Sequence, residues 1–268
     1  MEVAEIETAA ETMSISVLYH LINDVLGFLL YMHQQIPSML QDIGVEFDML
    51  QSAYTQLEAE LASTDLKASI RRKHNGRSRE VRQGIRRLEK LVNAVSSAQV
   101  ALKLVLSECP GTSEVILILG SSPLRPQYVY ELCFLHGNIS LSGSSDYSKC
   151  RAAEVLSKRA IRMLISKGVG SRSYPGCTKL FIFVKAPSSF NQPLHYLPKR
   201  EFKYNKKIVP FRLRFKCRAQ DQVMDKLDHQ SETGSSECLG DHISTDLIWF
   251  QCRHVIKGLV SKATLPEE

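Results

Sequence analysis

The sequence lacks the local motifs that mark nucleotide-binding and hydrolytic enzymes. It has no glycine-rich phosphate loop, because Gly168-Val-Gly170 lacks a third glycine and follows a predicted helix instead of a strand. None of its eight histidines lies in a His-Glu-x-x-His pattern, and no serine lies in the strand–turn–helix context of a hydrolase nucleophile. Catalytic groups can also assemble from distant positions, so an enzyme without a local motif is the minor alternative. We expect a protein that is not an enzyme, with no catalytic residue, no cofactor and no metal site.

Paired cysteines are also lacking. The number of cysteines is odd, and no two lie three positions apart, as zinc knuckles and redox pairs require. A chain of 268 residues can bury enough apolar surface to fold without disulfides or metals. Free cysteines are typical of a reducing compartment, which predicts cytosol or nucleus. The seven are Cys109, Cys133, Cys150, Cys177, Cys217, Cys238 and Cys252.

The sequence has no uninterrupted apolar run long enough to predict a membrane-spanning helix. The most apolar segment, Ile15 to Met32, is interrupted by Asn23 and Asp24, whereas a spanning helix needs about 20 residues with few charges at its centre. Residues 1–12 are acidic and lack the basic start of a secretory signal. We therefore expect residues 15–35 to form a core helix that ends before Pro37.

The order of hydrophobic patterns predicts an α+β fold. Helix-type spacing comes first, and most strand-type runs come later, which is typical of helices packed on a mainly antiparallel sheet. No break in composition divides the chain, so one domain over residues 14–260 is expected, with flexible segments at 1–13, 218–243 and 261–268. Beyond residues 15–35, the predicted helices cover 45–61 (or an irregular connection), 78–107 and 147–166, and the predicted strands cover 114–119, 127–134, 179–185, 208–217 and 246–258.

A basic cluster between Lys67 and Lys90 concentrates the positive charge of the chain, whose net charge is +6. Because Asn75-Gly76 interrupts it, we expect a solvated loop followed by a helix. Arg71-Arg72-Lys73 is a candidate nuclear import signal, the cluster could contact phosphates, and a plain solvated face is the third interpretation. The cluster has no aromatic residue, so it offers no stacking platform for single-stranded nucleic acid.

Four short segments, in order along the chain, carry a resemblance to a known family. They are Leu30–Pro37 with its Gln-Gln-Ile-Pro, Val115–Gly120 followed by Tyr130-Glu131-Leu132, Tyr196-Leu197-Pro198-Lys199, and Asp246–Gln251 followed by Ile256–Leu259. In type and order the segments resemble the comet family, the mitotic-arrest-deficient-two-binding proteins that silence the spindle assembly checkpoint.

The resemblance implies a single HORMA-like domain whose C-terminal strand closes as a safety belt. It also implies a non-catalytic adaptor that binds the closed conformer of the mitotic-arrest-deficient-two checkpoint protein and presents it to a hexameric Pch-two-type AAA+ ATPase. The residues that take the family's roles are Pro198 and Lys199 for the ATPase, Tyr31, Gln34, Gln35, Lys158, Ile161 and Arg162 for the checkpoint protein, and Ile248, Trp249, Phe250 and Gln251 for the belt.

This chain departs from the family at two places. Met32 stands where a polar residue is expected, and residues 150–166 contain no aromatic anchor, although buried aromatics are typical interface hot spots. Two rival functions follow from the same residues: a meiotic chromosome-axis or synaptonemal HORMA protein, and a basic nucleic-acid-binding protein. The expected location is nucleus and cytoplasm, at kinetochores or the spindle in mitosis, with no membrane partner.

Overall fold

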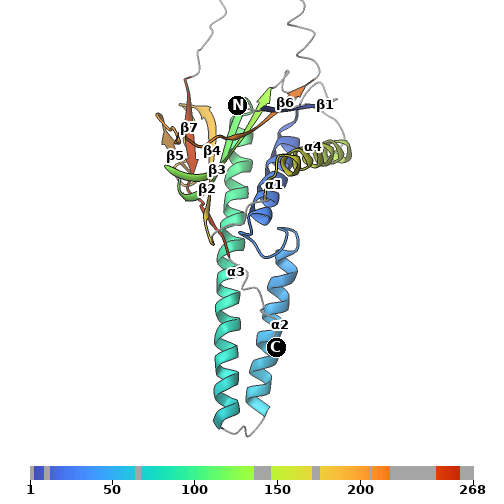
Figure 1. The fold of residues 1–268 in the computed structure, drawn as a ribbon, viewed down its shortest axis with the longest axis vertical. Coiled ribbons are helices and arrows are strands. Elements are labelled where there is room, and N and C mark those ends of the chain that lie inside the picture. Colours follow the sequence, from blue (N-terminus) through green and yellow to red (C-terminus); the bar gives the residue numbers. More distant parts are fainter. Residues whose placement is uncertain are drawn as a thin grey trace, which may run out of the picture.

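The computed structural model describes residues 3–8, 13–63, 68–135, 146–170, 176–205, 207–217 and 246–259. These residues form an α+β fold in which helices lie against one side of an open, mostly antiparallel sheet (Figure 1). The helices are α1 (Ile15–Met32), α2 (Ile43–Ser63), α3 (Ala68–Glu108) and α4 (Asp146–Ser166). The strands are β1 (Val3–Thr8), β2 (Glu114–Ser122), β3 (Arg125–Leu135), β4 (Lys179–Pro187), β5 (Tyr196–Lys199), β6 (Phe211–Cys217), β7 (Leu247–Cys252) and β8 (Ile256–Lys257).

The sheet has the strand order β1-β6-β3-β2-β4-β7-β5, and β8 pairs with one end of β4. Pairing is antiparallel except where β6 runs parallel to β1 and to β3. The continuous apolar runs at 115–119 and 180–184 occupy the two central strands β2 and β4, which are buried on both faces. The predicted mainly antiparallel sheet is confirmed.

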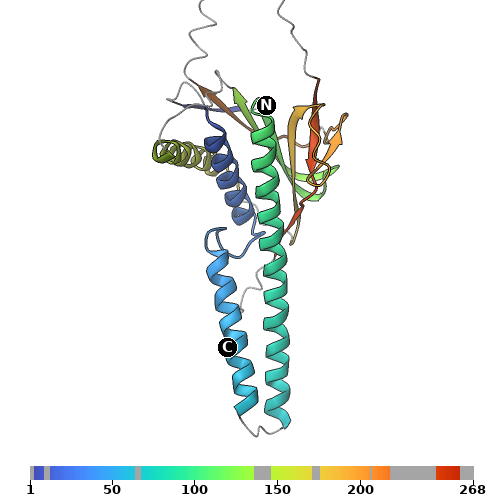
Figure 2. The same ribbon diagram turned by 180° about the vertical axis from the view of Figure 1, so that it is seen from behind.

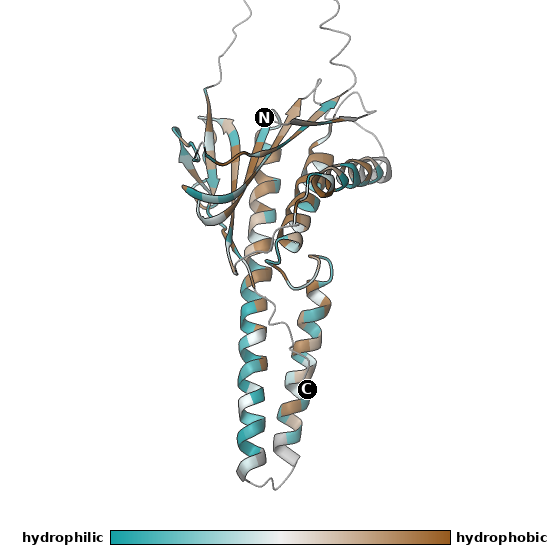
Figure 3. Ribbon diagram, viewed as in Figure 1, coloured by the Kyte–Doolittle hydropathy of each residue, from teal (hydrophilic) through white to brown (hydrophobic). Residues whose placement is uncertain are grey.

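Helix α1 is the centre of the core. The Ser14 hydroxyl accepts a hydrogen bond from the amide of Val17 and caps its first turn. By length and composition α1 could cross a bilayer. Its buried stripe nevertheless packs between α4, α3 and the sheet, as a core helix does (Figure 3). That stripe consists of Val17, Leu18, Leu21, Ile22, Val25, Leu26, Leu29 and Leu30.

Helices α2 and α3 form an antiparallel hairpin that extends beyond the sheet, and they lie side by side in both ribbon views (Figures 1 and 2). α3 has 41 residues, so it is about 60 Å long. Its second half lies against α1 and β8, whereas its first half lies beside α2. We call α2 together with residues 68–94 of α3 the arm.

The prediction of a loop at Asn75-Gly76 is wrong, because α3 continues through these two residues without a break. Both residues lie on the exposed side of the helix, away from α2. An internal glycine costs a helix only about 1 kcal/mol relative to alanine. Packing of α2 on the seam formed by Val81, Ile85 and Leu88 provides more than that, so tertiary contact overrides the local signal.

The expected flexible N-terminus is also wrong in part, since residues 3–8 form the edge strand β1. β1 pairs parallel with β6, and the ion pairs from Glu5 to Arg214 and Lys216, each 3.0 Å long, join the two strands. These hydrogen bonds hold the Glu5 pKa below its usual value. Residues 218–243 and 261–268, also expected to be flexible, lie outside the described residues.

The end of α1 is closed by a Schellman motif. The amide of Gln35 donates to the Leu30 carbonyl at 2.8 Å, and the amide of Gln34 donates to the Tyr31 carbonyl at 2.9 Å. Gln34 occupies the left-handed position of this motif with φ 53°, where glycine is usual. The chain thus leaves α1 in a direction that places Gln35 inside the core.

Gln35 joins three segments of the chain through its side chain and its backbone. Its Oε1 accepts from the Thr178 amide at 2.7 Å, its Nε2 donates to the His33 carbonyl at 2.7 Å, and its backbone carbonyl accepts from the Leu259 amide at 2.7 Å. The Gly258 amide in turn donates to the Thr178 carbonyl at 2.9 Å. We call these contacts the Gln35 network; it connects the end of α1, the start of β4 and the C-terminal segment.

The other face of the sheet has a small apolar cluster of its own. Phe202 stacks on Phe183 with ring centroids 3.9 Å apart, and Trp249 meets Phe202 edge-on at 6.5 Å. The Nζ of Lys185 lies 5.7 Å from the centre of the Trp249 ring. The only tryptophan of the sequence therefore packs with this cluster on one face of the sheet, as the apolar residues around it in the sequence predict.

Replacing Gly258 by alanine should destabilise the protein. A Cβ at this position would lie 2.1 Å from Gln35 Oε1, so the Gln35 network or the C-terminal segment must shift. We expect a loss of about 2 kcal/mol in the free energy of unfolding, measured by denaturant titration. Gly111→Ala is the matched control, because no atom lies within 4 Å of its added Cβ. Equal stability of the two variants would contradict the network.

His33 should make stability depend on pH. It is buried, its Nε2 lies 2.6 Å from the Tyr130 hydroxyl, and burial lowers its pKa to about 4. The unfolded chain, with a histidine pKa of about 6.5, binds a proton that the folded chain rejects, so stability falls as pH drops from 6.5 to 4. Between pH 7 and pH 5 this loss is about 2 kcal/mol.

The test compares urea unfolding at both pH values for the unchanged protein, His33→Gln and the exposed-site control His20→Gln. The His33 variant should lose less stability on acidification than the other two proteins. If all three lose the same amount, His33 is not the cause.

Candidate protein-interaction surface

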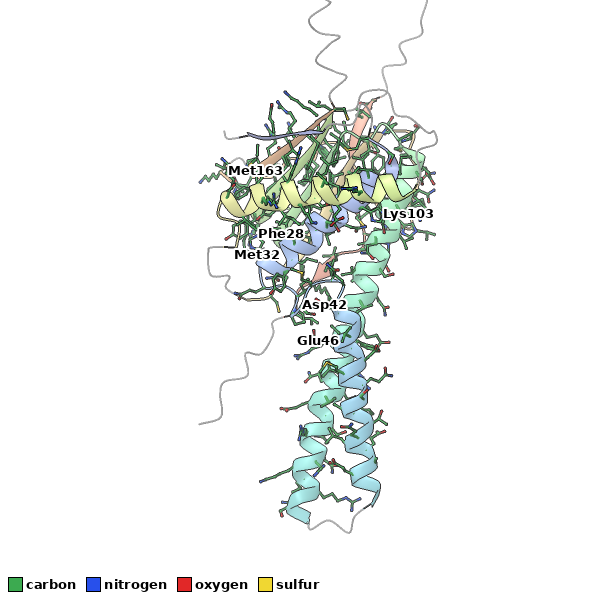
Figure 4. The ribbon with its side chains drawn as sticks, turned by 90° about the vertical axis from the view of Figure 1, so that its right-hand side faces the viewer. Phe28, Met32, Asp42, Glu46, Lys103 and Met163 are labelled. Carbon is green, nitrogen blue, oxygen red and sulfur yellow. The ribbon has the colours of Figure 1, made fainter. Side chains whose placement is uncertain are left out.

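Helix α4 lies across α1 on the outside of the molecule, with Met163 near the end of α1 that carries Phe28 and Met32 (Figure 4). Small and aliphatic residues at helical spacing, Ala153, Leu156, Ala160 and Leu164, are buried on its inner side. This spacing seats α4 on α1 and leaves its opposite face to solvent.

The outer face of α4 presents two apolar and two cationic side chains at steps of three and four residues. Val155 is 45% exposed and Ile165 is 52% exposed, both high for large aliphatic residues. Lys158 and Arg162 lie between them and are exposed as well. The Nζ of Lys158 forms an ion pair of 2.5 Å with Glu154, which lowers the pKa of that carboxyl group. Val155 and Ile165 thus provide apolar area at the two ends of this face and Lys158 and Arg162 provide charge at its centre, and protein interfaces combine both kinds of group.

Two of the predicted interface residues on α4, Lys158 and Arg162, belong to this exposed face, whereas Ile161 is half-buried on its flank. Sequence reasoning missed Val155 and Ile165. The sequence pattern could have identified them, because Val155 and Ile165 share the helical spacing of Lys158 and Arg162 and not that of the buried residues. They supply apolar contact area on the part of α4, residues 150–166, that has no aromatic residue.

The end of α1 presents two more predicted residues. Tyr31 is 40% exposed, and Gln34 is exposed in its left-handed conformation. The side-chain amide of Gln34 makes no hydrogen bond to the described part of the chain, so local structure does not account for a glutamine here. A non-glycine residue in this region costs about 1–2 kcal/mol and is found where function requires it.

Gln35 does not share this exposure. It is 1% exposed and its amide is fully engaged in the Gln35 network. The prediction that Gln35 contacts a partner directly is therefore wrong: it shapes the surface from below by fixing the end of α1.

Pro198 and Lys199 lie on the edge strand β5, exposed to solvent. They pair with Phe250 and Trp249 of β7. The neighbouring Tyr196 is buried, its hydroxyl donates to the Ala101 carbonyl of α3 at 3.0 Å, and burial raises its pKa. Tyr196 thus anchors β5 to the body, and the exposed Pro198-Lys199 pair is held in a fixed position.

β5 and α4 lie at opposite ends of the sheet. α4 packs near β1, the first strand of the order, and β5 is the last (Figure 1). Six strand spacings of about 4.8 Å separate the two edge strands by about 29 Å. A partner on α4 leaves β5 accessible to another.

The four predicted belt residues, Ile248, Trp249, Phe250 and Gln251, form the middle of β7. This strand lies between β4 and β5, and Ile248 and Phe250 are buried in the core. The chain continues from β7 into β8, which pairs with the start of β4 and leads to Gly258 in the Gln35 network. The C-terminal segment thus follows β4 along its whole length.

The remaining predicted sites are elsewhere. Arg71, Arg72 and Lys73 are exposed near the tip of the arm. Among the described residues, no three His, Cys, Asp or Glu side chains are grouped so that they could hold a metal ion. His195 and His254 form a pair, with 2.9 Å between Nδ1 and Nε2, but no described carboxylate or thiol completes a ligand set around them.

No known family model matches this chain, and no curated protein is significantly similar to it.

Replacing Gln34 by glycine should stabilise the fold. Glycine relieves the left-handed strain, and its greater freedom in the unfolded chain offsets part of the gain, which leaves about 0.5 kcal/mol. Gln56→Gly, in the exposed interior of α2, is the matched control and should lose about 1 kcal/mol. Thermal unfolding of both variants tests this. A Gln34→Gly protein less stable than the unchanged one would show that the glutamine is retained for the fold.

Proposed function

We propose that this protein is a non-catalytic, HORMA-like adaptor of the spindle assembly checkpoint. It binds the closed conformer of the mitotic-arrest-deficient-two checkpoint protein and presents it to a Pch-two-type AAA+ ATPase. The observation that carries the proposal is Gln34: an exposed, strained glutamine at the end of α1, the helix on which α4 packs, whose side chain bonds to no described residue. The α+β fold and the C-terminal strand along β4 support the same assignment.

The binding surface consists of the outer face of α4 and the end of α1. Val155, Ile165 and Tyr31 provide apolar area, and Lys158 and Arg162 provide charge that favours an acidic rim on the partner. Because the Gln35 network fixes the end of α1 and the buried residues of α4 hold that helix on α1, the backbone of this surface is in place before binding, which lowers the entropic cost of association.

Conformer selection follows from contact with a surface that only the closed partner has. An adaptor shifts its partner's equilibrium only by its difference in affinity for the two conformers, and each tenfold difference contributes about 1.4 kcal/mol. The energy for opening the partner comes from ATP hydrolysis by the ATPase. This division of labour agrees with a sequence that has no phosphate loop.

β5 is the proposed contact for the ATPase, through Pro198 and Lys199. Its distance from α4 allows the adaptor to hold both partners at once. The proposed location is nucleus and cytoplasm, with kinetochores or the spindle in mitosis.

Size-exclusion chromatography of the purified protein with the closed and the open checkpoint protein tests the proposal. We expect a stoichiometric complex with the closed form alone. Ile165→Asp should abolish it, because a carboxylate replaces an apolar contact, and Gln34→Gly should weaken it while the fold stays intact. Leu194→Asp is the matched control, since Leu194 is 79% exposed just before β5, at the end of the sheet opposite to α4. Equal loss in both aspartate variants, or no complex with either form, would overturn the proposal.

The ATPase contact needs a separate measurement. Lys199→Ala should leave the complex with the closed form unchanged and reduce adaptor-stimulated ATP hydrolysis at least fivefold. Lys179→Ala, an exposed lysine on β4, is its control.

A further inference from the structure

The arm separates its charges by helix. α2 carries four carboxylates and no lysine or arginine. Residues 68–94 of α3 carry nine lysines and arginines against two glutamates. Figure 3 shows the hydrophilic outer side of α3 along this length. Nine cations against two glutamates give residues 68–94 a formal net charge of +7, compared with +6 for the whole chain.

Five of these cations form a continuous ridge: Arg72, Arg79, Arg86, Arg87 and Lys90. Arg72, Arg79 and Arg86 follow each other at intervals of seven residues, which is two helical turns. All five are exposed on the side opposite to the Val81–Ile85–Leu88 seam that packs on α2. We call them the basic ridge. Over 18 residues it is about 27 Å long, the length of about eight base pairs of duplex.

The ridge cations are not neutralised by the described protein. The ion pairs between the two helices use other residues, Arg82 with Glu58 at 3.6 Å and His74 with Glu60 at 3.7 Å. No described carboxylate pairs with a ridge side chain. The two glutamates of this half, Glu80 and Glu89, lie about a quarter turn to either side of the ridge, given 100° of rotation per residue.

We propose that the basic ridge binds the phosphate backbone of double-stranded nucleic acid. Protein interfaces need apolar or aromatic anchors, and the outer face of α3 between Arg72 and Lys90 has none. Phosphate contacts need no such anchor and provide most of the affinity of sequence-independent binding. Seven of the nine basic residues are arginines, whose planar guanidinium groups match phosphate oxygens.

Single strands and membranes fit this surface less well. Residues 68–94 contain no aromatic side chain on which a base could stack. A helix that binds a lipid surface inserts an apolar face, and the apolar face of α3 is covered by α2. The carboxylates of α2 repel a polyanion, so the duplex would lie along α3 alone.

Fluorescence anisotropy with the full chain and a labelled mixed-sequence DNA duplex of about 20 base pairs tests the proposal, at salt concentrations between 50 and 300 mM. We expect micromolar affinity near 100 mM salt, and a log–log salt slope of about −4.5 for five phosphate contacts. Arg72→Gln/Arg79→Gln/Arg86→Gln should weaken binding more than tenfold and reduce the slope by about 2.7.

The control Arg125→Gln/Lys179→Gln/Arg253→Gln removes the same charge from exposed positions on the sheet and should bind as the unchanged protein does. Circular dichroism checks that both variants keep their helices. Equal losses in the two variants would mean that only net charge matters and would overturn the assignment.

Three competitors distinguish the other sources of negative charge. Tighter binding of a thymidine single strand, of poly-glutamate or of anionic phospholipid vesicles than of the duplex would each overturn the proposal, in favour of a single strand, an acidic protein or a membrane.

Discussion

The buried amide of Gln35 is the constraint on which the arrangement of the body depends. A side chain that is 1% exposed must have its donors and acceptor satisfied, because each buried unpaired polar group costs about 1–3 kcal/mol. Gln35 satisfies them only if the end of α1, the start of β4 and the segment after β8 meet at one point. Gly258 allows this approach, since any Cβ there would collide with the amide. The network thus fixes both the exit of α1 and the path of the C-terminal strand.

The exposed end of α1 follows from this constraint. For Gln35 to enter the core, the preceding residue must take the left-handed conformation of the Schellman motif, and glycine would do so at least cost. The chain has Gln34 there, and its side chain is exposed to solvent. The two glutamines therefore have different roles. Buried Gln35 fixes the position of the end of α1, and exposed Gln34 is part of the surface there. The sequence resemblance treats the two as one Gln-Gln pair and cannot separate them.

Elements with strong apolar periodicity could be predicted, and those whose stability comes from distant partners could not. α1, α4, β2, β3 and β4 lie close to their predicted bounds, because their own residues supply a buried stripe or run. β1 is only six residues long, and it forms because β6 offers an edge, two cations for Glu5 and a core position beside it for Ile6. Asn75-Gly76 stays helical because α2 packs alongside. At the site, the cations of α4 were predicted from the resemblance, while the exposure of Val155 and Ile165 depends on which side faces α1.

The arm poses a separate physical question, because its charge distribution does little for its stability. Interspersed charges would form more ion pairs across the hairpin, and the two pairs among its described residues are surface pairs worth roughly 0–1 kcal/mol each. Leu88 of α3 lies in the same apolar cluster as Phe47 and Leu50 of α2, and this packing holds the hairpin without them. The ridge cations repel one another at two-turn spacing, a cost that no described contact offsets. A rigid hairpin that keeps such a ridge unneutralised, away from the sheet and from the α4 surface, has the properties of a second binding module whose ligand supplies the missing negative charge.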